Sequence, residues 1–208
     1  MGEVRVASVT DPFAEDDPSL VVAAMEALLR LEAMGLLTSD VGKLDRSTLL
    51  GIAEAAARAG IAQTEAARLM GARHLDPETV REFLDRVTES LLESPMPGTE
   101  LVSLLELFDH DELARLLGSS ESSLRRYASG ARRTPDDLAA RAHFLSLVVG
   151  YLRGAYNDIG VRRWFARPRT TLGGKTPAQV LRRGWSPDSA AVGRVLELAR
   201  ALTASPVT

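Results

Sequence analysis

HDELARLLGSSESSLRRYASGARR, residues 110–133, holds two short runs of helical periodicity on either side of a glycine. Ala114 lies four residues before Gly118. This spacing suits two helices that cross closely, because a small residue fits the crossing and glycine accepts the positive φ of the turn. Ser119 or Ser120 is placed to cap the second helix by accepting a backbone N–H. The stretch therefore predicts a helix-turn-helix.

The second helix of this pair has an outward face that suits a DNA major groove. Leu124 and Tyr127 are three residues apart and are expected to face the core. The other side chains are short hydroxyls and arginines, which can read base edges, and the arginines beyond the helix can reach phosphates. The expected DNA-contacting residues are Ser120, Ser122, Ser123, Arg125, Arg126, Arg132 and Arg133. The alternative is an ordinary helical hairpin with a solvated polar face.

The composition favours an all-α protein. Hydrophobic residues make up 45% of the 208 residues and aromatic residues 5%, and Ala, Leu and Arg dominate. The absence of cysteine excludes disulfides and thiolate metal ligands and suits a reducing compartment. The N-terminus has no apolar signal core, and no run approaches the roughly 18 apolar residues of a membrane helix. We therefore expect a cytoplasmic protein with no membrane partner.

The net charge of −3 conceals an uneven distribution of charged residues. Residues 118–185 carry 13 Lys/Arg against 4 Asp/Glu, whereas the rest of the chain carries 12 against 24. Such segregation indicates a basic part of the chain that meets polyanions and an acidic part that does not. The alternative is that arginine merely replaces lysine on a solvated surface.

Four segments are predicted along the chain. Residues 1–17 are expected to form a disordered tail, and residues 18–94 an N-terminal helical module of unknown role. Two prolines and a glycine in ESPMPG, residues 93–98, mark a domain boundary or hinge. Residues 99–154 contain the helix-turn-helix and a long helix, and residues 155–208 form a compact helical unit.

The N-terminal module contains a second candidate turn. Residues 52–71 repeat the spacing of a small residue and a glycine, at Ala56 and Gly60, and so mimic a helix-turn-helix. The outer face of this segment is Gln63, Glu65 and Arg68. These residues do not form a DNA-reading surface, so a packing or dimerisation module is the favoured interpretation.

The long helix that begins near Asp136 is apolar over most of its circumference toward its C-terminal end. A helix of this kind must be buried on several sides, and a dimer interface is one natural partner for it. His143 lies within this helix and is interpreted as a packing residue rather than a ligand or a base.

The C-terminal quarter combines an apolar anchor, Trp164 and Phe165, with a Gly-Gly turn. Thr176 is followed by Pro177 and then by Gln179, which is the spacing of a capping box. The string Gly-Gly-Lys-Thr invites comparison with a phosphate-binding loop, but that motif requires glycine where Arg169 stands and a preceding strand. Nucleotide binding is therefore not expected here.

These residues resemble the Xre/MbcA/ParS family of antitoxins, whose toxin-binding domain carries W-[FL]-x-x-P-x-x-x-L-G-G-x-[ST]-P-x-x-[LV]-L. In this chain the pattern is occupied by Trp164, Phe165, Pro168, Leu172, Gly173, Gly174, Lys175, Thr176, Pro177, Val180 and Leu181. An Xre-like helix-turn-helix lies directly upstream in residues 109–133, as in that family, with Tyr127 and Gly130 near the end of its second helix. The resemblance covers residues 99–208 and leaves out about the first 95.

The resemblance implies a specific function. Family members are dimeric, bind operator DNA and neutralise a partner toxin with a RES domain, which consumes NAD. Carried over to this chain, residues 155–208 would be the toxin-binding domain, with Arg194 to Thr208 at the surface that blocks the toxin. The Trp164 to Leu181 block would mainly support that surface. The expected partners are operator DNA, a RES-type toxin and a second copy of the chain.

Two other functions are weighed against this antitoxin. A stand-alone dimeric transcription regulator would use residues 18–94 for sensing or dimerisation and would need no toxin. An enzyme is not expected, and neither is a cofactor, because the three histidines are far apart in sequence and no metal-ligand or nucleophile–base spacing is found. The histidines are His74, His110 and His143.

Overall fold

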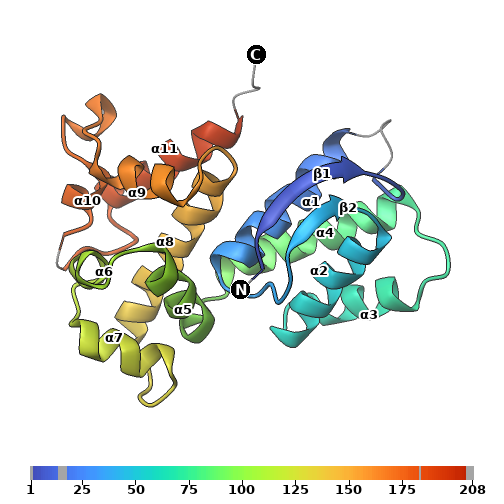
Figure 1. Cartoon of the computed structure of the whole chain (residues 1–208), viewed down its shortest axis with the longest axis horizontal. Helices are drawn as coiled ribbons and strands as arrows, with labels where there is room; N and C mark the ends of the chain where they lie inside the picture. The colour runs from blue at the N-terminus through green and yellow to red at the C-terminus, as the bar shows by residue number, and fades with distance from the viewer. Residues whose placement is uncertain (1, 14–17, 183, 205–208) are drawn as a thin grey trace. The chain divides into compact units, whose positions relative to one another are not determined.

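A computed structural model describes residues 2–13, 18–182 and 184–204, and the chain divides into two compact units, Met1–Ser94 and Pro95–Thr208 (Figure 1). The division lies within the proline-rich break at residues 93–98. The chain is mostly helical, as its composition predicts. A small sheet in the first unit is the departure from a purely helical fold.

The first unit combines a two-stranded parallel sheet with four helices in its described residues (Figure 1). Its elements are β1 (Val4–Val9), α1 (Pro18–Ala33), β2 (Val41–Leu44), α2 (Arg46–Arg58), α3 (Gln63–Gly71) and α4 (Pro77–Glu93). Val4 pairs with Val41 and Val9 with Leu44. Parallel strands need a crossover connection, and α1 supplies it.

Strand β1 shows that the prediction of a disordered tail over residues 1–17 is wrong for residues 4–9. The segment VRVASV places Val4, Val6 and Val9 in half-buried positions, and Phe13 beyond it is fully buried. Residues 14–17 lie outside the described residues. The strand escapes a local sequence pattern because its partner strand lies more than 30 residues further along the chain.

The helices of the first unit begin at the capping residues that the sequence offers. The Asp45 carboxylate accepts the Thr48 N–H at 2.9 Å, and the Asp76 carboxylate accepts the Thr79 N–H at 2.8 Å. The backbone and hydroxyl hydrogen bonds from Thr79 lower the pKa of Asp76. On α3, Glu65 pairs with Arg86 of α4 at 3.7 Å. One residue of the outer face of the second candidate turn thus pairs with a helix of its own unit, whereas Gln63 and Arg68 are exposed.

The second unit is built around one long central helix (Figure 1). Its elements are α5 (Pro97–Leu107), α6 (His110–Leu117), α7 (Glu121–Ala128), α8 (Asp136–Arg153), α9 (Asp158–Ala166), a 3₁₀ turn η1 (Thr170–Leu172), α10 (Pro177–Val180) and α11 (Ala190–Ala204). Helix α8 is the central one and packs against α5, α6, α9 and α11. The contact between α11 and α8 places the last described helix of the chain against the central helix of the unit.

The packing of α8 removes the need for a second copy to cover it. Leu145, Val148 and Leu152 are fully buried, and the helix is surrounded by neighbours from its own unit. The apolar circumference of α8 therefore does not require a second copy, and the role of α8 as a dimerisation helix stays a prediction. Its apolar faces form the core of the second unit instead.

A polar pair lies in this core between α5 and α8. The Nδ1 atom of His143 lies 2.6 Å from Oε1 of Glu100, which is fully buried. The second carboxylate oxygen of Glu100 accepts the Met96 N–H at 3.0 Å. Burial raises the pKa of Glu100, although the hydrogen bond to His143 opposes this effect. His143 is thus a core residue, as the sequence suggests, and it has an acidic partner.

Because the pKa of Glu100 is raised in the folded protein, the contribution of Glu100 to the free energy of unfolding should depend on pH. An acid with a raised native pKa adds stability below its unfolded pKa, and this contribution is lost as pH rises through the native pKa. The decrease in the free energy of unfolding caused by Glu100→Gln should therefore be larger at pH about 4 than at pH about 8. Urea unfolding of both proteins at several pH values measures this difference.

The matched control for this prediction is Glu106→Gln, which removes an exposed carboxylate from the same helix. A stability difference between the Glu100→Gln variant and the wild type that stays constant, or that grows with pH, would contradict the role assigned to burial.

Candidate nucleic-acid interface

Helices α6 and α7 meet at a turn whose geometry follows from two small residues. Gly118 adopts φ 67° and ψ 35°, the left-handed conformation that glycine adopts without strain. The N–H groups of Gly118 and Ser119 both donate to the carbonyl of Ala114, the latter at 3.0 Å. Ala114 itself is buried at the crossing. The four-residue spacing of Ala114 and Gly118 therefore produces the turn that the sequence predicts.

Two side chains from distant parts of the chain hold the end of α6. Arg141 of α8 donates to the carbonyl of Leu117 at 2.7 Å, and the indole N–H of Trp185 donates to the carbonyl of Leu116 at 2.7 Å. Arg141 is itself held by Asp137 one turn earlier. The last carbonyls of a helix have no partner within it, so these bonds satisfy groups that the turn leaves open.

Sequence analysis missed this contribution of Arg141 and Trp185. In the sequence Arg141 is one of many cations, and Trp185 stands in a polar context without a pattern around it. Trp185 also packs edge-on against Phe144 of α8, with the ring centroids 5.2 Å apart. A buried tryptophan requires an acceptor for its N–H, and this is the signal that points to such a role.

Helix α7 presents the predicted polar face. The hydroxyl of Ser120 caps the helix by accepting the Ser123 N–H at 3.2 Å, and it lies 3.2 Å from Ser122 Oγ and 2.9 Å from Ser123 Oγ. Leu124 and Tyr127 are buried on the opposite side. Ser120 is thus first a capping residue, and the two serines after it lie in the first turn of the helix.

The four arginines predicted to contact DNA differ in their partners. Arg125 is 60% exposed, and its guanidinium lies 2.8 Å from His110 Nδ1 and 3.5 Å from Glu121. Arg132 lies 5.6 Å from the ring centroid of Tyr127, and Arg133 pairs with Asp136. The exposed side chain of Arg126 has no ion-pair or hydrogen-bond partner in the part of the chain that the structure describes. Arg126 is therefore the most available of the four.

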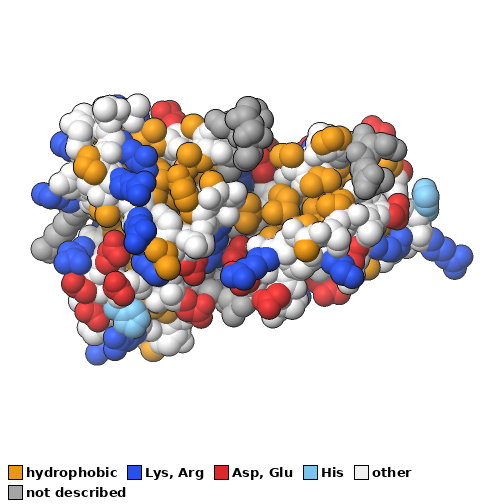
Figure 2. Space-filling model, turned by 45° about the horizontal axis from the view of Figure 1, so that its top comes forward, with side chains coloured by type: hydrophobic (Ala, Val, Ile, Leu, Met, Phe, Trp, Pro, Cys, Tyr) orange, Lys and Arg blue, Asp and Glu red, His pale blue; other side chains and the backbone are white. Residues whose placement is uncertain are grey.

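The excess positive charge of residues 118–185 is not spread evenly over its arginines. The four acids of this segment each pair with one arginine: Glu121 with Arg125, Asp136 with Arg133, Asp137 with Arg141 and Asp158 with Arg153. Arg162 is also occupied, because it donates to the carbonyl of Leu107 at 2.7 Å. Seven cations lack an ion-pair or hydrogen-bond partner among the described residues. Arg132 and Arg169 lie beside the rings of Tyr127 and Trp164. The other five are Arg126, Arg163, Arg167, Lys175 and Arg182. Figure 2 shows cationic side chains gathered beside apolar ones on the second unit.

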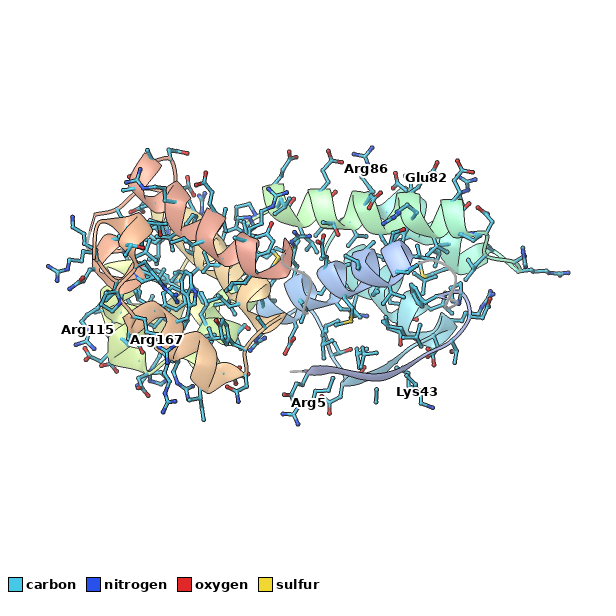
Figure 3. All side chains as sticks on the ribbon, turned by 90° about the horizontal axis from the view of Figure 1, so that it is seen from above. Arg5, Lys43, Glu82, Arg86, Arg115 and Arg167 are labelled. Carbon is cyan, nitrogen blue, oxygen red and sulfur yellow. The ribbon has the colours of Figure 1, made fainter. Side chains whose placement is uncertain are left out.

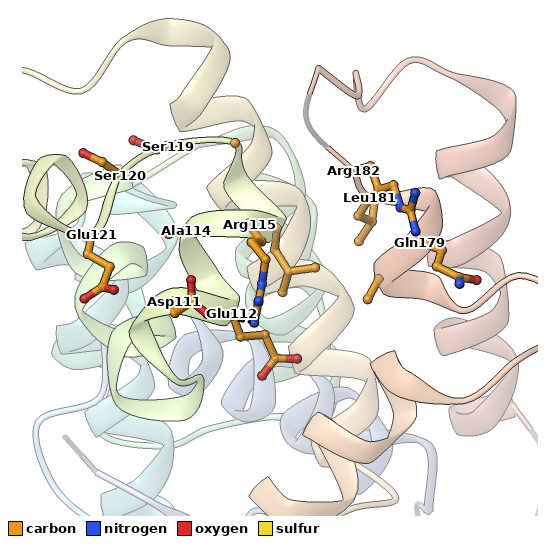
Figure 4. A pocket seen from close by; sticks show the side chains of 13 residues that line it. Asp111, Glu112, Ala114, Arg115, Ser119, Ser120, Glu121, Gln179, Leu181 and Arg182 are labelled. Carbon is orange, nitrogen blue, oxygen red and sulfur yellow. Dashed lines mark ion pairs between the residues drawn. The ribbon is translucent and has the colours of Figure 1, made fainter.

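A groove of about 1020 Å³ separates α6 and the turn after it from α10 (Figure 4). Asp111 and Arg115, which pair at 3.0 Å, line one side, and Arg182 lines the other. Glu112 also lines the groove. The pKa of Glu112 is raised, first by burial and second by the nearby carboxylate of Asp109. The mixed charges of this groove do not suit a polyanion. The outer face of α7 is the surface that does.

The segment from Trp164 to Pro177 forms a turn fixed by its own residues. Trp164 and Phe165 are buried with their rings 5.2 Å apart, and Phe165 also contacts Phe108 at 5.3 Å. The Arg169 guanidinium lies 5.2 Å from the Trp164 ring, and its Nε is buried without a hydrogen-bond partner in the described residues.

The Gly-Gly part of this turn leads directly into α10. Gly173 and Gly174 adopt φ 66° and 78°. Thr176 and Gln179 form the predicted capping box. Leu172 and Pro177 are buried, whereas Pro168 and Lys175 are exposed. Most positions of the pattern thus maintain the fold, and only the latter two offer side chains to a partner.

Comparison of the chain with protein-family models, with curated proteins and with solved structures finds no match. Within the described ranges, no group of three His, Cys, Asp or Glu side chains is placed to hold a metal ion. None of the described helices is both long enough and apolar enough to cross a bilayer. The site is therefore interpreted from its own geometry.

The left-handed conformation of Gly173 predicts a specific stability effect. A Cβ atom at this position would meet no heavy atom within 4 Å, so the cost of a substitution is conformational alone. Gly173→Ala should lower the free energy of unfolding by about 1 kcal/mol, whereas Gly173→Asn should cost less because asparagine tolerates this region. Chemical denaturation of the three proteins provides the measurement.

Gly193 in the interior of α11 is the matched control, because a Cβ there is also free of contacts but the backbone is helical. Gly193→Ala should raise stability by about 0.5–1 kcal/mol. If both alanine variants shift stability in the same direction, the conformational argument fails.

Proposed function

We propose that this protein is a cytoplasmic DNA-binding antitoxin that represses its own operon and neutralises a RES-type, NAD-consuming toxin. The observation that carries the proposal is the outer face of α7, where hydroxyls and the unpaired Arg126 follow a glycine turn. The Trp164 to Pro177 turn supports the second part, because it supplies the resemblance to the toxin-binding domain of Xre/MbcA/ParS antitoxins.

In this proposal α6 and α7 form a helix-turn-helix and α7 enters the major groove. Arg126 then reaches a guanine edge, Ser122 contacts a neighbouring base or phosphate, and Arg132 and Arg133 neutralise flanking phosphates. Two copies related by a two-fold axis would read half-sites one helical turn, about 34 Å, apart. The pairs that Arg125, Arg141 and Arg153 form with neighbouring acids make these three less available to the DNA backbone, whereas the exposed Arg133 would exchange Asp136 for a phosphate.

The toxin-binding part is assigned to residues 155–208. Helix α11 packs against α8 and forms the support, and the surface beyond it would meet the toxin. The motif residues act mainly by holding α9, η1 and α10 in place. Pro168 and Lys175 are the exposed motif positions that are available to a partner.

A stand-alone dimeric regulator is the second candidate function. The observation in its favour is that residues 1–94 form a compact unit of their own, which the resemblance does not cover. A unit of this size could hold a signal-sensing site. Purification of the protein from its native host separates the two functions, because a stoichiometric RES-domain partner is expected only for the antitoxin.

The assignment of α7 as the recognition helix predicts a selective loss of DNA binding. Arg126→Ala should weaken binding to the DNA upstream of its own gene by about 1–3 kcal/mol and relax discrimination against a scrambled fragment. Arg133→Ala should weaken binding to both fragments and reduce the slope of log K against log salt by about 1. Fluorescence anisotropy at several salt concentrations measures both effects.

Arg115→Ala is the matched control, since Arg115 is an exposed arginine of α6 that pairs with Asp111 away from the outer face of α7. Equal losses for the Arg115 and Arg126 variants would refute the assignment of the reading face.

A truncation separates the two proposed activities. Because α11 extends to Ala204 and buries Ala199, the change that preserves its packing removes only residues 205–208. This variant should keep its affinity for DNA and lose at least part of its ability to rescue the growth of cells that express the RES-domain protein encoded beside it. Loss of both activities would instead indicate misfolding, and unchanged rescue would contradict the role of the C-terminal residues.

A further inference from the structure

Helix α9 carries an aromatic ring that is fixed against its backbone. A Cβ atom at Gly160 would lie 2.8 Å from Cβ and 3.1 Å from Cδ1 of Tyr156, so the tyrosine side chain rests on the helix where glycine leaves room for it. The N–H of Gly160 donates to the side chain of Asn157 at 2.9 Å and holds this first turn. Tyr156 is nevertheless 37% exposed. The ring is therefore held against α9 and still offers part of its surface to a partner.

Two arginines continue the line that this ring begins. Arg163 and Arg167 lie three and seven residues after Gly160, so the three positions share one side of α9, and Figure 3 shows Arg167 directly beyond its last turn. The helical rise places Arg163 about 4.5 Å beyond Gly160 and Arg167 about 6 Å beyond Arg163. Both arginine side chains are exposed and have no ion-pair or hydrogen-bond partner among the described residues. Tyr156, Arg163 and Arg167 together form a surface that we call the α9 stripe.

The turn after α9 adds a third cation next to the end of the α9 stripe. The N–H of Arg169 donates to the carbonyl of Lys175, and the N–H of Gly174 donates to the carbonyl of Arg169, both at 3.0 Å. These bonds bring Lys175 back to a point two residues after Arg167. The side chain of Lys175 is exposed and has no ion-pair partner in the described ranges. Available positive charge thus continues beyond the helix.

Nearby acids do not neutralise this surface. Residues 159–187 contain seven cations and no Asp or Glu. Asp158, at the start of α9, pairs with Arg153 of α8 at 3.5 Å. Ile159 lies four residues before Arg163 and is 53% exposed, so an aliphatic side chain flanks the stripe. The surface therefore combines an aromatic ring, an aliphatic side chain and unpaired cations, and it complements a polyanion that also carries planar apolar groups.

We propose that the α9 stripe binds single-stranded nucleic acid, with a base stacked on Tyr156 and backbone phosphates on Arg163 and Arg167. Cations that follow the backbone and aromatic rings on which bases stack are the two components of such binding sites. The bases of a duplex stay stacked on each other, so only a single strand can present an open base to the ring. An acidic polypeptide or a lipid headgroup needs the arginines but not the ring. The combination of ring and cations therefore favours a single strand.

The α9 stripe is separate from the face of α7 that is proposed to read duplex DNA. Helix α7 packs on α5 and α6, whereas α9 packs on α8 and α10. The inference therefore goes beyond the proposed function and does not rest on it. A protein that binds a single strand through α9 but no operator would refute only the proposed function, and the reverse result would refute only this inference.

The experiment titrates a fluorescently labelled oligothymidine of about 20 nucleotides with the full-length protein and measures anisotropy at several salt concentrations. Arg163→Gln/Arg167→Gln should weaken binding at least about tenfold at low salt and reduce the slope of log K against log salt by about 1.4, because two phosphate contacts are lost. Tyr156→Leu should weaken binding at least about fivefold because it removes the stacking ring, whereas Tyr156→Phe should stay within about twofold of the wild type.

Arg115→Gln is the matched control, since Arg115 is an exposed arginine of α6 that pairs with Asp111, and this variant should bind the oligothymidine like the wild type. Far-UV circular dichroism checks the fold of each variant. The arginine variant changes only exposed side chains, so it tests the proposal even if Tyr156→Leu disturbs the packing on Gly160.

Three outcomes overturn the proposal. The first is a wild type that binds the oligothymidine more weakly than about 100 μM at low salt, which is the weak end of non-specific nucleic-acid affinity. The second is a loss for the arginine variant with none for Tyr156→Leu; displacement of the strand by poly-L-glutamate of equal charge would then assign the face to an acidic protein. The third is an equal loss for Arg115→Gln, which would show that binding follows total charge rather than the α9 stripe.

Discussion

The second unit depends on how the end of α6 is satisfied. Arg141 and Trp185, from distant parts of the chain, donate to the carbonyls of Leu117 and Leu116, and Gly118 turns the backbone away directly after them. A helix end buried without such partners would be costly, so these bonds stabilise the end of α6 from which the turn into α7 starts. They also join the turn to α8 and to the segment after α10, so the proposed DNA-reading face rests on the core of the whole unit.

Charge is distributed in this protein by pairing. In residues 118–185 each acid has an arginine beside it, and other arginines, such as Arg162, bind helix carbonyls. The cations that remain lie on α7 and along α9 to α10. The described cations of residues 118–185 therefore fall into two groups. One group pairs with acids or helix carbonyls within the unit, and the other is available to a partner. The proposed contacts to DNA draw on Arg126 from the available group and on Arg132 and Arg133 beside it.

The resemblance to Xre/MbcA/ParS antitoxins and the structure address different properties. The motif around Gly173 describes a turn with a buried aromatic anchor and a capped helix, and these features stabilise the fold whatever the partner. The function proposed from that motif therefore depends on exposed neighbours that the motif itself does not specify. Residues 1–94 form a separate acidic unit that the resemblance does not cover.

Much of the local structure could be predicted because it depends on residues within one or two turns of each other. The Ala114–Gly118 turn, the Ser120 cap, the burial of Leu124 and Tyr127 and the Thr176 capping box all belong to this class. Strand β1 could not, since its partner lies beyond a whole helix and a two-stranded sheet leaves a weak pattern.

The sequence by itself thus determined the helical periods, the turns and the charge segregation. The first two depend on neighbouring residues, and the third depends on the number of charged residues in each segment. Only the tertiary structure decided that α8 is covered by its own unit, that Glu100 meets His143, and that Arg141 caps a helix while Arg126 stays unpaired. The physical reason is that each of these outcomes depends on which remote carbonyl, carboxylate or apolar face comes within a few ångströms of the side chain.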